Sequence, residues 1–253
     1  MENIFLGIIQ GITEFLPVSS SGHLVVFSNL FSNSLNTYEI AFLHLGTLFS
    51  IIVFYFKEIF NYFRDIKELL KITKLIIIGV LPAAAVGLLL PIEELIDSSR
   101  FILIITFVSY CFLALILIFI EKFDEGQKTL SDLTLKNALY IGLAQSLALL
   151  PGISRSGITL ATAISLKVKK TEAIFFSLLL GIPTIFGAWV LTFLQSDNQI
   201  ETSFLLPVVV AFISGLLAIK ILINFTVNSK LQIFAKYCLF MGILSLVTYL
   251  VNL

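Results

Sequence analysis

Two short segments place polar and charged side chains inside an otherwise apolar chain. The first, residues 10–23, reads QGITEFLPVSSSGH and carries Glu14, a run of three serines and His23. The second, residues 151–159, reads PGISRSGIT and places Arg155 between two serines. A serine or a histidine near a carboxylate can supply a nucleophile and its base, while an arginine presents a planar fork that matches phosphate oxygens. These residue types indicate chemistry on a phosphate group.

Spacing assigns roles within the first segment. Gln10 and Glu14 are four residues apart and therefore share one face of a helix. His23 follows Ser20 by three residues, so we expect Ser20 to be a nucleophile that His23 activates. Two alternatives stay open, because spacing does not distinguish them: His23 itself attacks, or His23 is the base for an attacking water molecule.

The second segment is predicted to bind the anion. It opens a new helix, and free N–H groups at a helix start, together with the helix dipole, attract negative charge. Arg155 adds charge and bidentate geometry. The further predicted phosphate-binding residues are Ser154, Ser156, Gly157 and Thr159 beside it, and Ser19 and Ser21 in the first segment.

The two segments belong to an internal repeat. Residues 7–22 and 142–157 align without a gap, with five of 16 positions identical, and Ser20 then takes the place of Arg155. Each copy consists of a short helix, a break rich in Pro, Ser and Gly, and a second short helix. The expected helices, 2–16, 24–31, 137–150 and 158–166, are too short to cross a bilayer. Each copy therefore predicts a re-entrant hairpin whose break lines a cavity.

Composition requires that these hairpins lie in lipid. The chain has 253 residues, of which 58% are hydrophobic and 13% charged, more apolar surface than one soluble core could bury. Apolar runs predict six spans, at 39–56, 75–92, 101–120, 173–194, 204–223 and 233–252. The expected fold is an all-α polytopic membrane protein forming one integral membrane domain, 1–253, with six transmembrane helices and two re-entrant hairpins.

Charge distribution predicts the orientation. Of the 16 Lys and Arg residues, 14 fall in four connections, which should be cytoplasmic. Three spans separate the hairpins and invert the second copy, giving an inverted-topology repeat of about 1–120 and about 137–253 around a central site. Both termini are then outside, and we expect the site to open to the outer face. The net charge of zero gives no indication of nucleic-acid binding.

Three features outside the two segments carry weaker expectations. His44 stands alone in an apolar run and is predicted to be a packing histidine. Glu39 and Glu172 are expected to begin two equivalent spans, one after each hairpin. Residues 57–71 are amphipathic and predict one interfacial cytoplasmic helix.

In both segments, QGITEFLPVSSSGH and PGISRSGIT, the chain resembles the undecaprenyl-diphosphate phosphatase family, also called bacitracin-resistance proteins. The resemblance extends over essentially the whole length of the chain. The resemblance implies an enzyme of the bacterial inner (plasma) membrane that hydrolyses undecaprenyl diphosphate to undecaprenyl phosphate and inorganic phosphate, recycling the lipid carrier of cell-wall synthesis. It also implies a divalent cation, Mg²⁺ or Ca²⁺, near Glu14 and Gln10, although many members have Glu at position 10. The catalytic residues carried over by resemblance are Glu14, Ser20, His23 and Arg155.

One alternative function comes from another class of protein. Inverted repeats with broken helices are typical of transporters, so the chain could be a transporter or flippase of a lipid phosphate or small anion. Only the cluster of serine, histidine and acid favours hydrolysis. The expected partners are a polyprenyl diphosphate lipid, the membrane bilayer and a second copy in a homodimer.

Overall fold

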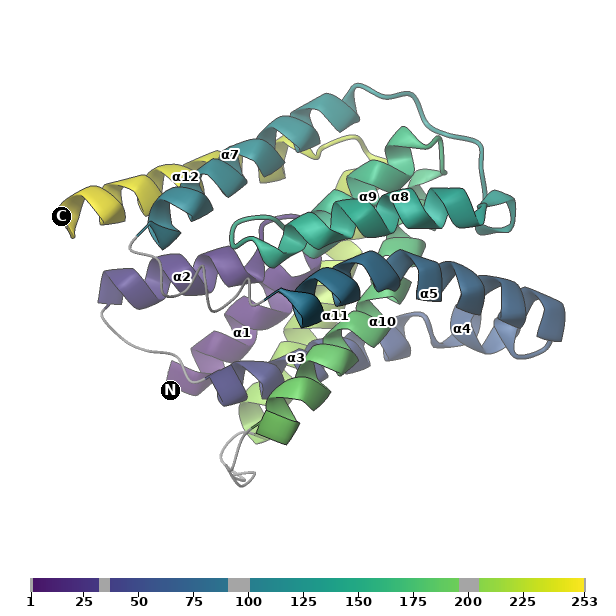
Figure 1. The fold of residues 1–253 in the computed structure, drawn as a ribbon, viewed down its shortest axis with the longest axis horizontal. Helices are drawn as coiled ribbons and strands as arrows, with labels where there is room; N and C mark the ends of the chain where they lie inside the picture. The colour runs from purple at the N-terminus through teal and green to yellow at the C-terminus, as the bar shows by residue number, and fades with distance from the viewer. Residues whose placement is uncertain (1, 32–36, 91–100, 196–204, 253) are drawn as a thin grey trace.

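The computed structural model describes residues 2–31, 37–90, 101–195 and 205–252, and regular structure within them is helical. Five described helices are long and apolar enough to cross a membrane. A sixth span is possible if α3 (Thr37–Phe54) and α4 (Phe56–Tyr62), which meet at a 70° bend, form one span. An apolar helix satisfies its own backbone hydrogen bonds, as lipid requires. The six predicted spans are confirmed as helices (Figure 1): α3 (Thr37–Phe54), α5 (Ile66–Leu89), α7 (Ile102–Glu121), α10 (Lys170–Gln195), α11 (Leu205–Val227) and α12 (Gln232–Val251).

Four shorter helices form the two helix–break–helix units that the repeat predicts. They are α1 (Glu2–Phe15), α2 (Ser20–Phe31), α8 (Leu135–Ser146) and α9 (Arg155–Ser165). The 14 residues of α1 extend only about 21 Å, less than the ~30 Å hydrocarbon core of a bilayer. The second helix of each unit begins earlier than expected, at residue 20 rather than 24 and at 155 rather than 158. Ser20 and Arg155, which align in the repeat, are therefore both first residues of a helix.

Each break is a turn that a helix cannot continue through. Ser19 has φ of 63° and Gly152 has φ of 96°, both in the left-handed region. Glycine adopts this region freely, whereas a serine there costs of order 1 kcal/mol and persists only where its surroundings hold it. The second break also contains a short 3₁₀ turn, η2 (Leu147–Leu149).

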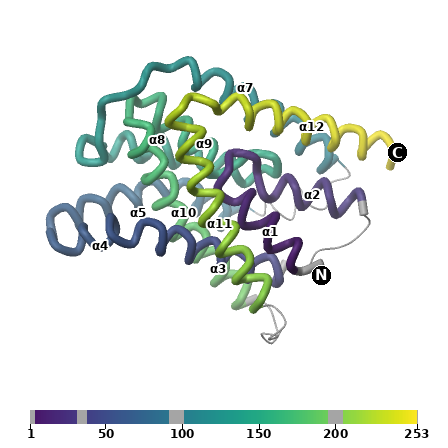
Figure 2. Tube along the Cα trace, turned by 180° about the vertical axis from the view of Figure 1, so that it is seen from behind, coloured from purple at the N-terminus to yellow at the C-terminus, as the bar shows by residue number. Residues whose placement is uncertain are grey.

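The helices of the two halves pack reciprocally. α1 packs on α11 and α8 packs on α5, while α7 pairs with α12 and α3 with α10. Figures 1 and 2 show α7 and α12 side by side. Gly7 and Gly142, which align in the repeat, mark close contacts in these two pairs, because an added Cβ would collide with the Pro207 carbonyl of α11 and the Gly79 carbonyl of α5, respectively. Each half thus completes the packing of the other.

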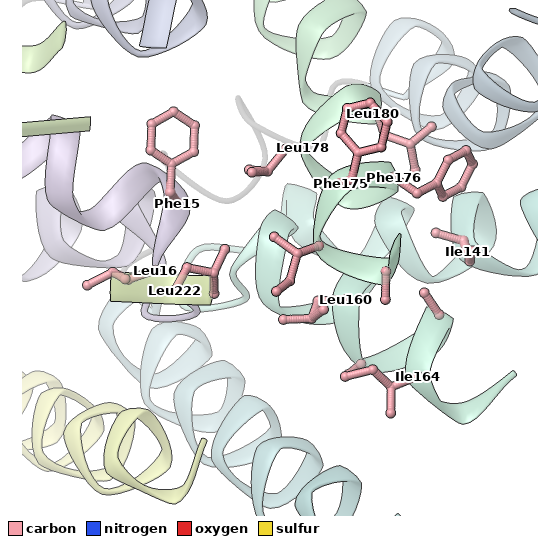
Figure 3. Packing of buried hydrophobic residues seen from close by; sticks show 14 of the residues in the cluster. Phe15, Leu16, Ile141, Leu160, Ile164, Phe175, Phe176, Leu178, Leu180 and Leu222 are labelled. Atoms are coloured by element: carbon pink, nitrogen blue, oxygen red, sulfur yellow. The ribbon is translucent and has the colours of Figure 1, made fainter. Parts of the chain in front are cut away.

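A core of buried side chains lies beside the two breaks and draws on both halves (Figure 3). Phe15 at the end of α1 and Phe176 on α10 are fully buried, and Leu160 on α9 is nearly so. Lipid is as apolar as these side chains, so the packing is stabilised by close van der Waals contact rather than by removal from water. The core fixes the position of one break relative to the other.

The prediction of one interfacial helix over 57–71 is wrong. α4 ends at Tyr62 and α5 begins at Ile66, with Asp65 between them as the N-cap of α5. The Asp65 side chain accepts a hydrogen bond from the Lys67 backbone N–H at 2.8 Å. The Asp65 carboxylate thus takes a backbone donor that a continuous helix would pair with a carbonyl, so one helix ends and the next begins here. In Figure 1 this turn lies at the opposite end of the molecule from the start of α1 and the end of α12.

Candidate active site

The two breaks contact each other, as the repeat predicts. The Gly152 backbone N–H donates to Ser19 Oγ at 3.1 Å, across 133 residues of sequence. Ser154 Oγ donates to the Leu16 carbonyl at 3.3 Å. Backbone at the breaks has lost its helical partners, so each break satisfies polar groups of the other.

Arg155 reaches from the start of α9 to Glu14 on α1. Its Nη2 donates to Glu14 Oε1 at 2.9 Å, and only 11% and 7% of the two side chains are exposed. Two charges so poorly hydrated must be paired, because either alone would carry a large desolvation cost. Nη1 also donates to the Ser177 carbonyl on α10 at 3.3 Å, which fixes the plane of the guanidinium. A fixed positive charge therefore stands where the two breaks meet.

The other carboxylate oxygen of Glu14 accepts from the first segment. Gln10 Nε2 and Ser20 Oγ both donate to Oε2 at 3.1 Å. A hydroxyl directed at a carboxylate can lose its proton to that carboxylate as it attacks. The structure therefore places the Ser20 hydroxyl on Glu14, whereas spacing suggested His23 as its partner.

His23 supports the first break. Its Nδ1 lies 2.7 Å from the Ser19 carbonyl, which can only accept, so Nδ1 carries a proton. Nε2 lies 2.7 Å from the hydroxyl of Tyr237, whose ring stacks on the imidazole, and the Tyr110 hydroxyl lies 3.1 Å from Nδ1. These contacts hold the left-handed conformation of Ser19. The structure does not show the expected pairing of His23 with Ser20, because the two side chains have different partners.

Most of the predicted phosphate-binding residues of the second segment are engaged in holding the hairpin. Ser154 caps α9 by accepting from the Gly157 N–H at 3.1 Å, so the free N–H expected at Gly157 has a partner. Ser156 lies 3.0 Å from the Ser154 hydroxyl. Thr159 donates to the Arg155 carbonyl at 2.8 Å. We expected these residues to contact phosphate directly. In the structure, however, their polar groups are buried and hydrogen-bonded within the protein.

The remaining predicted residues differ in their access to a ligand. Ser19 is buried, and its hydroxyl accepts from the N–H groups of Gly22 and Gly152. Ser21 is exposed, and Ser20 is partly exposed. Together with Arg155, these two serines are the members of the predicted set through which a ligand can contact the site.

Three residues of the site were missed by the sequence analysis. His44 on α3 places Nε2 3.4 Å from Glu14 Oε2, so its expected role in packing alone is corrected. Ser177 on α10 lies 2.6 Å from the Thr159 hydroxyl, and Gly181 leaves space that the Arg155 guanidinium fills. A signal was present: His44 and Ser177 each stand five residues after the glutamates expected to begin equivalent spans.

The side chains as arranged do not fit a resident divalent cation. Both oxygens of Glu14 face hydrogen-bond donors, and one of those donors is a guanidinium that would repel a cation. Gln10 presents its amide nitrogen, not its oxygen, to the carboxylate. Among the residues that the structure describes, no three His, Cys, Asp or Glu side chains form a metal-binding group. Mg²⁺ and Ca²⁺ require several oxygen ligands, which the protein alone does not supply here.

Comparison with known proteins covers nearly the whole chain. The family model described as bacitracin resistance protein BacA matches residues 3–244. An undecaprenyl-diphosphatase of Thermosipho africanus is 42% identical over 97% of this chain and 98% of its own length. Proteins with the same name from Thermotoga petrophila and Methanococcus vannielii are 40% and 38% identical, over 96% and 99% of this chain and 98% and 100% of their own lengths.

Proposed function

The chain belongs to the bacitracin resistance protein BacA family, and from this premise we propose that it hydrolyses undecaprenyl diphosphate to undecaprenyl phosphate and inorganic phosphate. The observation that carries the proposal is the buried carboxylate of Glu14, which binds the Ser20 hydroxyl on one oxygen and the Arg155 guanidinium on the other. A nucleophile, its base and an anion-binding group thus meet among membrane helices. The product would return the lipid carrier to cell-wall synthesis.

The reaction follows from this arrangement. Arg155 takes oxygens of the terminal phosphate and stabilises charge as it develops. Ser20 Oγ attacks the terminal phosphorus while its proton passes to Glu14. The P–O bond to the bridging oxygen breaks, and undecaprenyl phosphate leaves. Glu14 gives that proton to the departing oxygen of undecaprenyl phosphate and, again a carboxylate, takes a proton from the water that attacks the phosphoserine. The Ser20–phosphorus bond breaks, Ser20 Oγ takes the proton back from Glu14, and inorganic phosphate is released.

Direct attack by His23, or its action as base for water, is supported less well by the contacts. Both imidazole nitrogens have partners in the protein, at the Ser19 carbonyl and the Tyr237 hydroxyl. The Ser20 hydroxyl, by contrast, donates to Glu14 and can transfer its proton to that carboxylate. We assign His23 to the support of the break.

The family resemblance implies that the enzyme requires Mg²⁺ or Ca²⁺, and this requirement is part of the proposal. Because the side chains do not fit a resident cation, we propose that a cation would arrive bound to the diphosphate, whose oxygens would supply the ligands that Glu14 and Gln10, as arranged, do not. The reaction steps above use only groups of the protein and the substrate.

The inverted repeat and its re-entrant hairpins are part of the proposal. The reciprocal packing supports them, because α1 and α8 are equivalent in the repeat and each packs on a helix of the other half. Orientation is proposed from charge: the four basic connections are cytoplasmic, both termini are outside and the site opens to the outer face of the bacterial plasma membrane. The α4–α5 turn, at the opposite end of the molecule from the start of α1 and the end of α12, supports this arrangement. A homodimer is also proposed, and the mass of the purified protein in detergent tests it.

The function is tested by phosphate release from undecaprenyl diphosphate by the purified protein, in detergent and in sealed vesicles. If the protein is a phosphatase, it should release phosphate in detergent, where no gradient or second compartment exists. Movement of labelled lipid phosphate across sealed vesicles without phosphate release would overturn the proposal in favour of the transporter or flippase. The names of the similar proteins favour hydrolysis.

A further inference from the structure

His44 lies outside both segments that carry the proposed chemistry, on α3, yet its imidazole is directed at their shared carboxylate. Nδ1 lies 2.8 Å from the Ile40 carbonyl, one helical turn earlier. That oxygen can only accept, so Nδ1 donates to it and the ring is fixed in orientation. Nε2 is thereby held 3.4 Å from Glu14 Oε2.

This contact becomes important when the substrate binds. In the structure, Arg155 holds Glu14 through Oε1, but the same guanidinium is the group that would bind the phosphate. A guanidinium shared with phosphate oxygens holds the carboxylate less firmly. Glu14 must nevertheless stay within reach of the Ser20 proton during attack, because a misplacement of about 1 Å can cost 100-fold in rate.

The contacts on Oε2 decide what can hold Glu14 at that stage. Gln10 lies on the same helix as Glu14, and Ser20 is the reacting group, so neither anchors the carboxylate to another part of the fold. His44 does, because α3 is a separate long helix that packs on α1. Its side chain is 27% exposed, whereas that of Glu14 is 7% exposed, so His44 also borders the approach to the carboxylate.

We propose that His44 is a positioning residue: it holds Glu14 Oε2 where it accepts the Ser20 proton while Arg155 engages the phosphate. The inference rests on the proposed phosphatase function and deepens it. A histidine that served packing alone would be satisfied by the Ile40 carbonyl. The second ring nitrogen, placed against the base, is what assigns His44 to the reaction.

The test compares His44→Leu, which removes the donor and keeps an apolar side chain of similar size, with His44→Gln, whose amide can still donate to Glu14. Steady-state phosphate release from undecaprenyl diphosphate and thermal unfolding are measured for each. We expect His44→Leu to lower kcat about 10- to 100-fold with KM within about twofold of wild type. We expect His44→Gln to keep kcat within about threefold. Phe49→Ala, on the exposed side of the same helix, is the control and should match wild type.

Wild-type kcat in His44→Leu would overturn the inference. So would a loss of about tenfold or more in His44→Gln, and this comparison stands even if His44→Leu does not fold. A wild-type protein that releases no phosphate would contradict the proposed function and the inference with it. A wild-type protein that hydrolyses the substrate, beside an unaffected His44→Leu variant, would contradict the inference alone.

Discussion

Ser20 and Arg155, the first residues of α2 and α9, both donate a hydrogen bond to the Glu14 carboxylate, at 3.1 and 2.9 Å. They align in the internal repeat, so two turns of similar shape carry different side chains to one acceptor. A hydroxyl comes from one side and a guanidinium from the other. In the proposed reaction the hydroxyl is the nucleophile, the guanidinium binds the anion, and the carboxylate between them is the base.

The nucleophile can be identified by trapping the phosphorylated enzyme. With substrate labelled in the terminal phosphate, rapid acid quenching should leave label on Ser20 as acid-stable phosphoserine. Ser20→Ala should retain no label and should lose about 1,000-fold or more in kcat. Ser21→Ala is the matched control and should still be labelled. An acid-labile label that disappears in His23→Gln would assign the attack to His23.

Space beside the Arg155 guanidinium is predicted to be necessary for activity. A Cβ on Gly181 of α10 would collide with the guanidinium, whereas a Cβ on Gly187 of the same helix would have no neighbouring atom within 4 Å. We expect Gly181→Ala to lower kcat/KM about 10- to 100-fold by displacing Arg155 from Glu14. Gly187→Ala should leave phosphate release unchanged. Equal activity in the two variants would show that Arg155 need not lie where the structure places it.

Removal of divalent cations tests how the metal enters. If the cation arrives with the diphosphate, chelation should slow phosphate release, and the rate should follow the concentration of the cation–diphosphate complex. Equilibrium dialysis of the substrate-free protein against radioactive Ca²⁺ should detect no stoichiometric site at micromolar concentrations. Stoichiometric binding that Glu14→Gln abolishes would establish Glu14 as the ligand of a resident cation.

Accessibility of Ser21 tests the orientation. In a protein whose Cys111 and Cys238 are replaced by alanine, we expect Ser21→Cys to react with a membrane-impermeant thiol reagent added outside intact cells, because Ser21 is exposed. Lys74→Cys, an exposed position on α5 among the basic residues predicted to be cytoplasmic, should react only when the reagent reaches the cytoplasm. The reverse pattern would place the site on the cytoplasmic face.

Much of the fold could be predicted because lipid makes sequence patterns simple. Apolar length predicted six long helices, of which five qualify singly as candidate spans, and the polar, helix-breaking residues shared by residues 7–22 and 142–157 predicted the two breaks. The break at residues 63–65 was missed because hydrophobic periodicity continues through it. Asp65 ends that continuity by a local hydrogen bond that periodicity does not register.

The site was less predictable because its contacts depend on tertiary structure. Ser20 was assigned to His23 from a spacing of three residues. Ser20, however, begins a helix immediately after a left-handed residue, Ser19, which directs the hydroxyl to Glu14. His44 was set aside because a single histidine in an apolar run carries no signal of its own; its role appears only when α3 lies against α1.

The coupling between Glu14 and Arg155 tests the central claim most directly. The measurement is kcat/KM for phosphate release in a double-mutant cycle of Glu14→Gln and Arg155→Lys, with thermal unfolding as the check on folding. If one site is assembled from both breaks, each single variant should lose about 100-fold or more, and the double variant should be within a few-fold of the weaker single variant. Wild-type activity in either single variant, or a loss in the double variant equal to the product of the two, would contradict it.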